Sequence, residues 1–188
     1  PQGFLAAASE GTGDVITICL VKEIVGSPES GNLAAVEGLQ FRSGSRIMVA
    51  LTVGADLQQN LYHQMYYAIE TRLLSSSNDC YQWDKLNPKK FSYDYDWERN
   101  AQRSADQHLT GKNRYFVDIP SMFSPSVDRA TIMQYAMTPG NEDVFKSTYM
   151  QKKLNTLCTG IRESFGMKKF PDSFLWEQYL NQSIAYTD

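Results

Sequence analysis

Three carboxylates at alternate positions are the residues of this chain whose types and spacing come closest to a chemical site. Asp94, Asp96 and Glu98 lie in the run 91–98, where aromatic and polar residues alternate. A period of two predicts a β-strand with the acids on one face, about 6.5–7 Å apart. Such oxygen ligands can hold Mg²⁺ or Ca²⁺, and crowded carboxylates raise one pKa, as acid–base chemistry requires.

The same acidic row also fits the solvated face of a sheet, and we favour that interpretation. Acidic residues are common on the wet side of an antiparallel strand. Arg99 and Arg103 follow closely and can neutralise the row, and no second acidic cluster stands out in the sequence. The metal or acid–base site at Asp94, Asp96 and Glu98 is therefore the alternative hypothesis.

Aromatic residues are concentrated in the middle third of the chain. Phe91, Tyr93, Tyr95 and Trp97 occupy the other face of the predicted strand, and we expect that face to be buried against a helix. Tyr81 and Trp83 stand in a polar segment instead, and we predict them as binding residues. Exposed Tyr and Trp side chains stack on ligands and anchor protein interfaces.

The cysteines do not point to a disulfide framework. Cys19, Cys80 and Cys158 are odd in number and widely spaced, which favours a reducing intracellular compartment. Cys80 with His63 or His108 would supply a thiol nucleophile and its base. No motif of a known thiol enzyme surrounds Cys80, so we expect these residues to be structural.

Composition excludes some classes of function. The chain has 188 residues, 42% of them hydrophobic, and a net charge of −3. No basic run exceeds the pairs 89–90 and 168–169, so we do not expect this chain alone to bind nucleic acid. No segment reaches the ~18 apolar residues that a membrane span needs. The first residue is Pro1, which fits either a processed terminus or a piece of a longer polypeptide.

Hydrophobic patterning predicts a sheet backed by one long helix. Strands are expected at 15–21, 46–53, 91–98 and 115–119, with the first two paired antiparallel. The first is apolar on both faces, which is typical of a central strand. Apolar residues at helical spacing predict an amphipathic helix from about 56 to 75.

The C-terminal part of the sequence is expected to be helical. Ser124 and Pro125 are typical of a helix start, and this helix should run to about Met137. A second helix should follow from about 141 to 165, and a third after Pro171. The expected fold is thus one α+β domain over 1–188: a mainly antiparallel sheet of about four strands with its backing helix within 1–120, and a helical layer over 121–188.

The sequence contains no diagnostic catalytic motif, and it assigns no cofactor. We expect a non-catalytic structural or assembly subunit that binds neighbouring proteins, or copies of itself, through aromatic-rich loops at 76–100. The alternative is a metal-dependent or acid–base enzyme, or a ligand-binding domain, that uses the acidic row.

Overall fold

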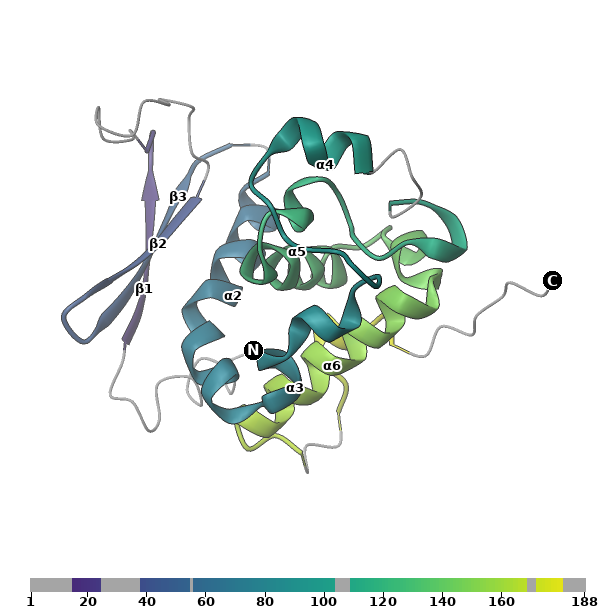
Figure 1. The fold of residues 1–188 in the computed structure, drawn as a ribbon. Coiled ribbons are helices and arrows are strands. Elements are labelled where there is room, and N and C mark those ends of the chain that lie inside the picture. The colour runs from purple at the N-terminus through teal and green to yellow at the C-terminus, as the bar shows by residue number, and fades with distance from the viewer. Residues whose placement is uncertain (1–14, 25–37, 55, 104–108, 169–171, 181–188) are drawn as a thin grey trace. The chain divides into compact units, whose positions relative to one another are not determined.

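The computed structural model of the chain is a mixed α/β structure that divides into two compact units. The units comprise residues 1–71 and 72–188. The structure describes residues 15–24, 38–54, 56–103, 109–168 and 172–180 (Figure 1). The predicted α+β class is confirmed, and the single-domain organisation stays a prediction.

The first unit contains a three-stranded mixed sheet. Its strands are β1 (Val15–Val21), β2 (Gly38–Ser43) and β3 (Arg46–Thr52), in the spatial order β1-β3-β2. Strand β1 pairs in parallel with β3, with Ile18 opposite Val49, whereas β2 pairs antiparallel with β3. The predicted antiparallel pairing of β1 and β3 is therefore wrong.

A tight hairpin explains this difference in pairing. Ser43 and Arg46 are paired residues, so the loop between β2 and β3 has only two residues, and Gly44 has a φ of 60°. The primed turns of two-residue hairpins require such a positive φ, which glycine adopts without strain. Strand β2 runs opposite to β3 and occupies one edge of it, so β1 pairs with the other edge. Because the chain reverses once more than expected, in forming β2, β1 and β3 run in the same direction.

The long predicted helix is confirmed as α2 (Leu57–Ser76). In the first unit it approaches the sheet closely at Gly38, where an added Cβ would lie 2.8 Å from Cγ of Gln64. Gly38 is the partner of Leu51 in β3, so both residues lie on the same sheet face. Ile47, Val49 and Leu51 are buried on this face.

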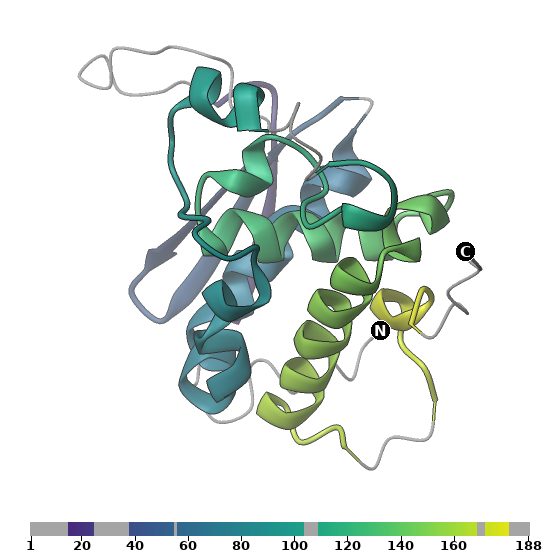
Figure 2. The same ribbon diagram turned by 45° about the vertical axis from the view of Figure 1, so that its right-hand side comes forward.

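The second unit is built from helices and short 3₁₀ turns. Figure 2 shows the long helix α6 in green with the yellow η7 segment beside it. The elements after α2 are α3 (Asn78–Tyr81), η2 (Trp83–Leu86), α4 (Trp97–Arg103), η4 (Gly111–Asn113), η5 (Pro120–Met122), α5 (Pro125–Met137), η6 (Glu142–Lys146), α6 (Thr148–Ser164) and η7 (Leu175–Glu177).

Local capping signals predicted some of these helices well. Helix α5 begins as expected, because the Ser124 hydroxyl accepts a hydrogen bond from the N–H of Val127 at 3.2 Å. The helix expected at 141–165 is instead divided into η6 and α6 at Ser147. The Ser147 hydroxyl caps α6 and also donates to the carbonyl of Arg114 at 2.7 Å. This second contact is distant in sequence, so periodicity alone did not predict the break.

Two predicted strands are absent from the described part of the chain, so the four-strand sheet is wrong. Residues 91–96 are irregular and lead into α4, and residues 115–119 are irregular before η5. In the first case Asp96 Oδ1 accepts a hydrogen bond from the N–H of Arg99 at 3.0 Å. This is the contact of a helix N-cap, and it ends the extended segment after three alternations. Where a helix was expected after Pro171, the described residues 172–180 contain only η7.

The helices do not resemble membrane spans. Within the residues described, every helix is too short or too polar to cross a bilayer.

Candidate functional site

The run 91–98 does not present its aromatic residues on one face. Phe91 and Tyr93 turn inward, with the Phe91 ring centroid 4.6 Å from that of Phe116. The Tyr93 hydroxyl donates a 2.7 Å hydrogen bond to Oδ2 of Asp128. The first half of the run is therefore part of the core of the second unit, although the strand predicted to place it there does not form.

The second half of the run forms an exposed aromatic patch, which comprises Tyr95, Trp97 and Phe123. Tyr95 is 72% exposed and Trp97 is 54% exposed. Their ring centroids lie 5.8 and 6.0 Å from that of Phe123, which is half-buried. Both exposed rings therefore pack against Phe123, and these aromatic contacts hold the patch together.

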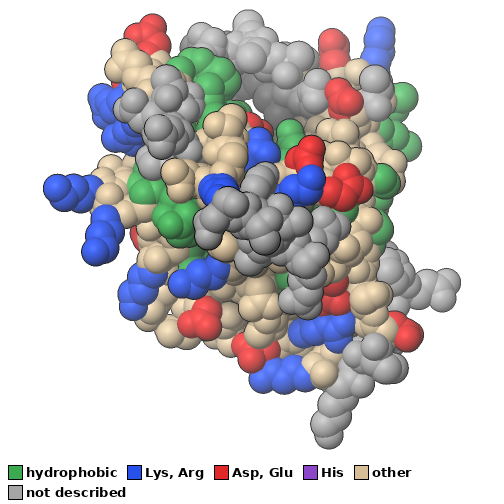
Figure 3. Space-filling model, turned by 90° about the vertical axis from the view of Figure 1, so that its right-hand side faces the viewer, with side chains coloured by type: hydrophobic (Ala, Val, Ile, Leu, Met, Phe, Trp, Pro, Cys, Tyr) green, Lys and Arg blue, Asp and Glu red, His purple; other side chains and the backbone are tan. Residues whose placement is uncertain are grey.

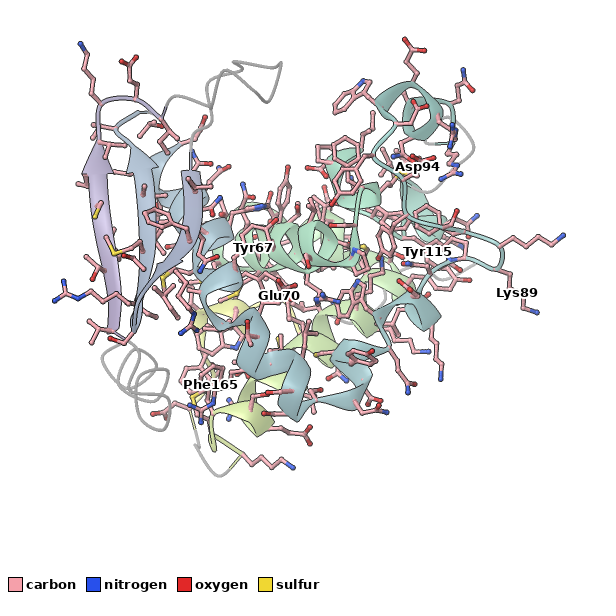
Figure 4. All side chains as sticks on the ribbon, turned by 60° about the vertical axis from the view of Figure 1, so that its left-hand side comes forward. Tyr67, Glu70, Lys89, Asp94, Tyr115 and Phe165 are labelled. Atoms are coloured by element: carbon pink, nitrogen blue, oxygen red, sulfur yellow. The ribbon has the colours of Figure 1, made fainter. Side chains whose placement is uncertain are left out.

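The acidic row lies beside this patch and is occupied by Arg99. Asp94, which Figure 4 labels where the chain enters α4, pairs with Arg99, and Asp96 pairs with the same guanidinium at 3.3 Å. The N–H of Asp96 donates to Asp94 at 3.0 Å; this bond and the Arg99 charge lower the pKa of Asp94. Glu98 is exposed on α4.

The three predicted metal ligands are close in sequence, but the structure does not arrange them around a common point where a metal ion could bind. Within the described residues, no three His, Cys, Asp or Glu side chains gather in a way that would hold a metal ion. Asp94 and Asp96 instead share Arg99 as a counter-ion. A role of Asp94, Asp96 and Glu98 in metal binding stays a prediction.

A buried polar cluster is the most unusual site in the second unit. Oδ2 of Asp128 accepts hydrogen bonds from Lys153 Nζ at 2.6 Å, Trp83 Nε1 at 2.8 Å and Tyr93 Oη at 2.7 Å. The side chains of Asp128 and Lys153 are 0% exposed. The Lys153 ammonium also lies 4.0 Å from the centroid of the Phe116 ring, a cation–π contact.

Burial governs the ionisation of this cluster. Desolvation lowers the pKa of Lys153, although the Asp128 carboxylate opposes that effect. Desolvation and the charge of Asp128 both raise the pKa of the Tyr93 phenol. Asp128, Lys153 and Trp83 are buried and Tyr93 is half-buried, so the cluster joins α5, α6 and the 83–93 segment within the core of the second unit.

The two predicted binding residues therefore lie in opposite environments. Tyr81 is 73% exposed, whereas Trp83 is fully buried against Asp128 and Arg129. Sequence reasoning missed the partner Asp128 and its counter-ion Lys153. A signal was present, because Lys153 is in phase with the buried stripe of α6, three residues after Met150 and four before Leu157.

The thiol of Cys80 is not arranged as a nucleophile. Its Sγ is buried and donates to the carbonyl of Thr156 at 3.5 Å, and desolvation raises its pKa. A raised pKa favours the protonated, unreactive thiol. His63 belongs to the first unit, and His108 lies outside the described residues.

Two open pockets are small for a ligand site. One, of about 220 Å³, lies in the second unit and the other, of about 290 Å³, in the first. Ligand pockets usually measure roughly 300–1,000 Å³. Among the described residues drawn in Figure 3, both basic and acidic side chains lie on this face. The pocket in the second unit is lined by Asp79, Gln82, Lys85, Leu86, Lys152 and Thr156. The pocket in the first unit is lined by Gly38, Leu39, Gln40, Gln64 and Tyr67.

Comparisons with known proteins add no relative: no family model matches the chain, and no curated protein and no solved structure matches it.

Proposed function

We propose that this chain is a non-catalytic assembly subunit that docks a neighbouring protein through the aromatic patch. The observation that carries the proposal is the exposure of Tyr95 and Trp97, 72% and 54%, on one half-buried supporting ring. Large aromatic side chains that remain in water are costly, and Tyr and Trp are the residues that most often dominate binding energy at interfaces.

The patch is also prepared for binding before a partner arrives. Trp97 begins α4, whose start is capped by Asp96, and the Asn100 side chain donates to the carbonyl of Asp94 at 2.5 Å. These contacts fix the backbone on both sides of Tyr95. A rigid patch loses little conformational entropy on association, so more of its contact energy contributes to affinity.

The charges around the patch indicate the chemistry of the partner. Arg99 already neutralises Asp94 and Asp96, whereas Glu98 is exposed on the same helix. A complementary partner segment would place apolar side chains on Tyr95 and Trp97 and an Arg or Lys near Glu98. We therefore propose a partner polypeptide that is both apolar and basic.

The proposed compartment is reducing and intracellular. All three cysteines are free thiols, and Cys80 and Cys158 are buried. Free thiols persist where disulfide formation is suppressed.

Selection of a displayed random peptide library on the purified chain tests the proposed function. We expect the selected peptides to combine apolar residues with Arg or Lys. Their affinity should fall roughly 30-fold in Tyr95→Ala/Trp97→Ala, since loss of an interface hot spot costs about 2 kcal/mol. Tyr81→Ala is the matched control, because Tyr81 is 73% exposed and lies outside the patch. Peptides that bind the double variant as tightly as the wild-type chain would contradict the proposal.

A further inference from the structure

The strand β1 forms one margin of the sheet, and its outer edge has no partner among the residues that the structure describes (Figure 4). Its seven residues carry no charge. Val15, Ile18 and Leu20 are 54%, 45% and 61% exposed. Edge strands are usually protected by charged residues, bulges or proline, so an uncharged apolar edge is a site for strand pairing.

The backbone groups available at this edge follow from the pairing with β3. Val15 donates its N–H to Ser45 at 3.2 Å, and the carbonyl of Val21 accepts from Val53 at 3.1 Å. The inward-directed residues of β1 are therefore the odd-numbered ones. Because backbone groups alternate along a strand, Ile16, Ile18 and Leu20 direct their N–H and C=O groups outward.

The order of side-chain types along β1 is nearly the same when the strand is read in either direction. Read from Val15 or backwards from Val21, it places Ile18 at the centre. An antiparallel pairing of two copies about Ile18 would set Ile18 opposite itself, Val15 opposite Val21, Ile16 opposite Leu20 and Thr17 opposite Cys19. Three of the four kinds of facing pair are then apolar on both sides, and Thr17 with Cys19 brings together two small side chains.

We propose that β1 pairs with β1 of a second copy of this chain, antiparallel about a two-fold axis through Ile18. The residues whose backbone groups point outward, Ile16, Ile18 and Leu20, are symmetric about Ile18. In the dimer, Ile16 of one copy and Leu20 of the other therefore form a hydrogen-bonded pair, as do the two copies of Ile18. The two sheets join into one continuous sheet across the dimer, and the apolar side chains of the two β1 strands lie beside one another on its faces.

The two edges of the sheet differ in charge, because β2 carries Arg42 whereas β1 carries no charged residue. A charged edge is protected against strand pairing, so β1 is the edge that is open to it. The symmetry of β1 about Ile18 then favours a second copy of the same strand as the partner.

Charge substitution at the two-fold axis tests the register directly. Ile18→Lys and Ile18→Glu each place like charges opposite one another, so each variant alone should dimerise at least tenfold more weakly than the wild-type chain. An equimolar mixture of the two variants should recover dimers, because a heterodimer opposes a base to an acid. Light scattering and native mass spectrometry over a concentration series measure both effects, with Ile18→Val as the conservative control and circular dichroism as the check of folding.

A cross-link provides a second measurement that does not depend on weakening the dimer. Facing residues of a non-hydrogen-bonded antiparallel pair have Cα atoms about 4.5 Å apart, within the range that a disulfide spans. In Thr17→Cys, the new thiol of one copy would face Cys19 of the other, so mild oxidation should give a covalent dimer. Thr17→Cys/Cys19→Ser should not give that dimer.

A wild-type chain that remains monomeric at high concentration would overturn the proposal. So would a dimer that Ile18→Lys does not weaken, a mixture of the charged variants that stays monomeric, or oxidation of Thr17→Cys that gives no covalent dimer. These outcomes are distinct from failure of the proposed function, because Tyr95 and Trp97 belong to the second unit and β1 to the first.

Discussion

Lys153 donates a 2.6 Å hydrogen bond to Oδ2 of Asp128, and solvent reaches neither side chain. The same oxygen accepts from Trp83 and Tyr93, whereas Oδ1 of Asp128 accepts no hydrogen bond within the described residues. One oxygen atom thus joins α5, α6, η2 and the segment before α4. A buried ion pair of this kind makes each partner dependent on the other.

Asp128→Asn should lower the free energy of unfolding by about 3–5 kcal/mol, because Lys153 then has no buried counter-ion. In a Lys153→Met background the same substitution should cost much less, since the amide oxygen can still accept from Trp83 and Tyr93. Urea denaturation of the four proteins of this double-mutant cycle measures the coupling. Additive costs would contradict the dependence of one charge on the other.

Tyr93 should make the protein less stable at alkaline pH. Burial and the charge of Asp128 raise the pKa of its phenol in the folded state above the ordinary value of 10.0. The unfolded chain therefore loses this proton first, so the stability that Tyr93 contributes is complete below pH 10 and declines as the pH rises further. Tyr93→Phe should be less stable than the wild-type chain by about 1 kcal/mol near neutral pH, and the difference should narrow above pH 10.

Trp83→Phe is the control for this pH dependence. It removes another hydrogen bond to Oδ2 of Asp128 but no titrating group. Its deficit in stability should remain constant between pH 8 and about pH 11, measured by urea denaturation at each pH. If Tyr93→Phe and Trp83→Phe gave parallel curves, the assignment to the Tyr93 proton would be wrong.

Glu177 should contribute stability that is lost in acid. Burial opposes its ionisation, but two hydrogen bonds from Arg162, at 2.5 and 2.7 Å, and one from the N–H of Phe174 lower its pKa below 4.5. This contribution is present above pH 4.5 and disappears as the pH falls through the lower, folded-state pKa. Glu177→Gln should cost about 1 kcal/mol at pH 7, a modest value because Arg162 is partly exposed.

The acid dependence distinguishes this ion pair from a simple loss of packing. The difference between Glu177→Gln and the wild-type chain should close as the pH falls below 4.5. Glu163→Gln is the matched control, because Glu163 pairs with Lys168 on the exposed surface and should contribute little. Thermal unfolding from pH 7 to pH 2 measures both, and a deficit of Glu177→Gln that does not change with pH would refute the prediction.

Gly160→Ala should destabilise the protein although alanine is the better helix former. A Cβ at this position of α6 would lie 2.5 Å from Sγ of Cys80 and 3.0 Å from Oγ of Ser77. Such overpacking costs typically about 1–3 kcal/mol. Cys80→Ala removes the closest atom, so the double variant should lose less stability than the sum of the two single variants.

Thr159→Ala is the control for Gly160→Ala, because Thr159 is exposed on the same helix. Its change in unfolding free energy should be within about 0.5 kcal/mol of zero. Equal stability of Gly160→Ala and the wild-type chain in urea would show that α3 and α6 are not closely packed at this point.

Parts of the fold were predictable wherever neighbouring residues decide the structure. The β-branched residues of β1 and β3, the apolar spacing of α2 and the start of α5 at Ser124 all depend on short-range preferences. The hairpin that makes β2 was also open to prediction, because Gly44-Ser45 is a typical two-residue turn between strands. That signal was missed, and with it the order of the sheet.

The candidate site was only partly predictable. The sequence identified Tyr95 and Trp97 as members of an aromatic run, but it placed them in the core with Phe91 and Tyr93. An alternating pattern predicts which residues share a face only if a strand forms. No strand forms at this point, because Asp96 caps a helix. The exposure of the aromatic patch thus depends on where the strand-like pattern ends.

The sequence by itself determined the class of the fold, the uncharged character of β1 and the acidic row beside the aromatic run. The sequence also placed Arg99 close enough to neutralise that row. Only the tertiary structure decided that β1 stands at an edge of the sheet, and that the run 91–98 turns half inward and half outward. The reason is physical: the edge position of β1 and the inward turn of the run depend on contacts between residues far apart in the chain. Tyr93 turns inward because its hydroxyl reaches Asp128, which lies 35 residues away.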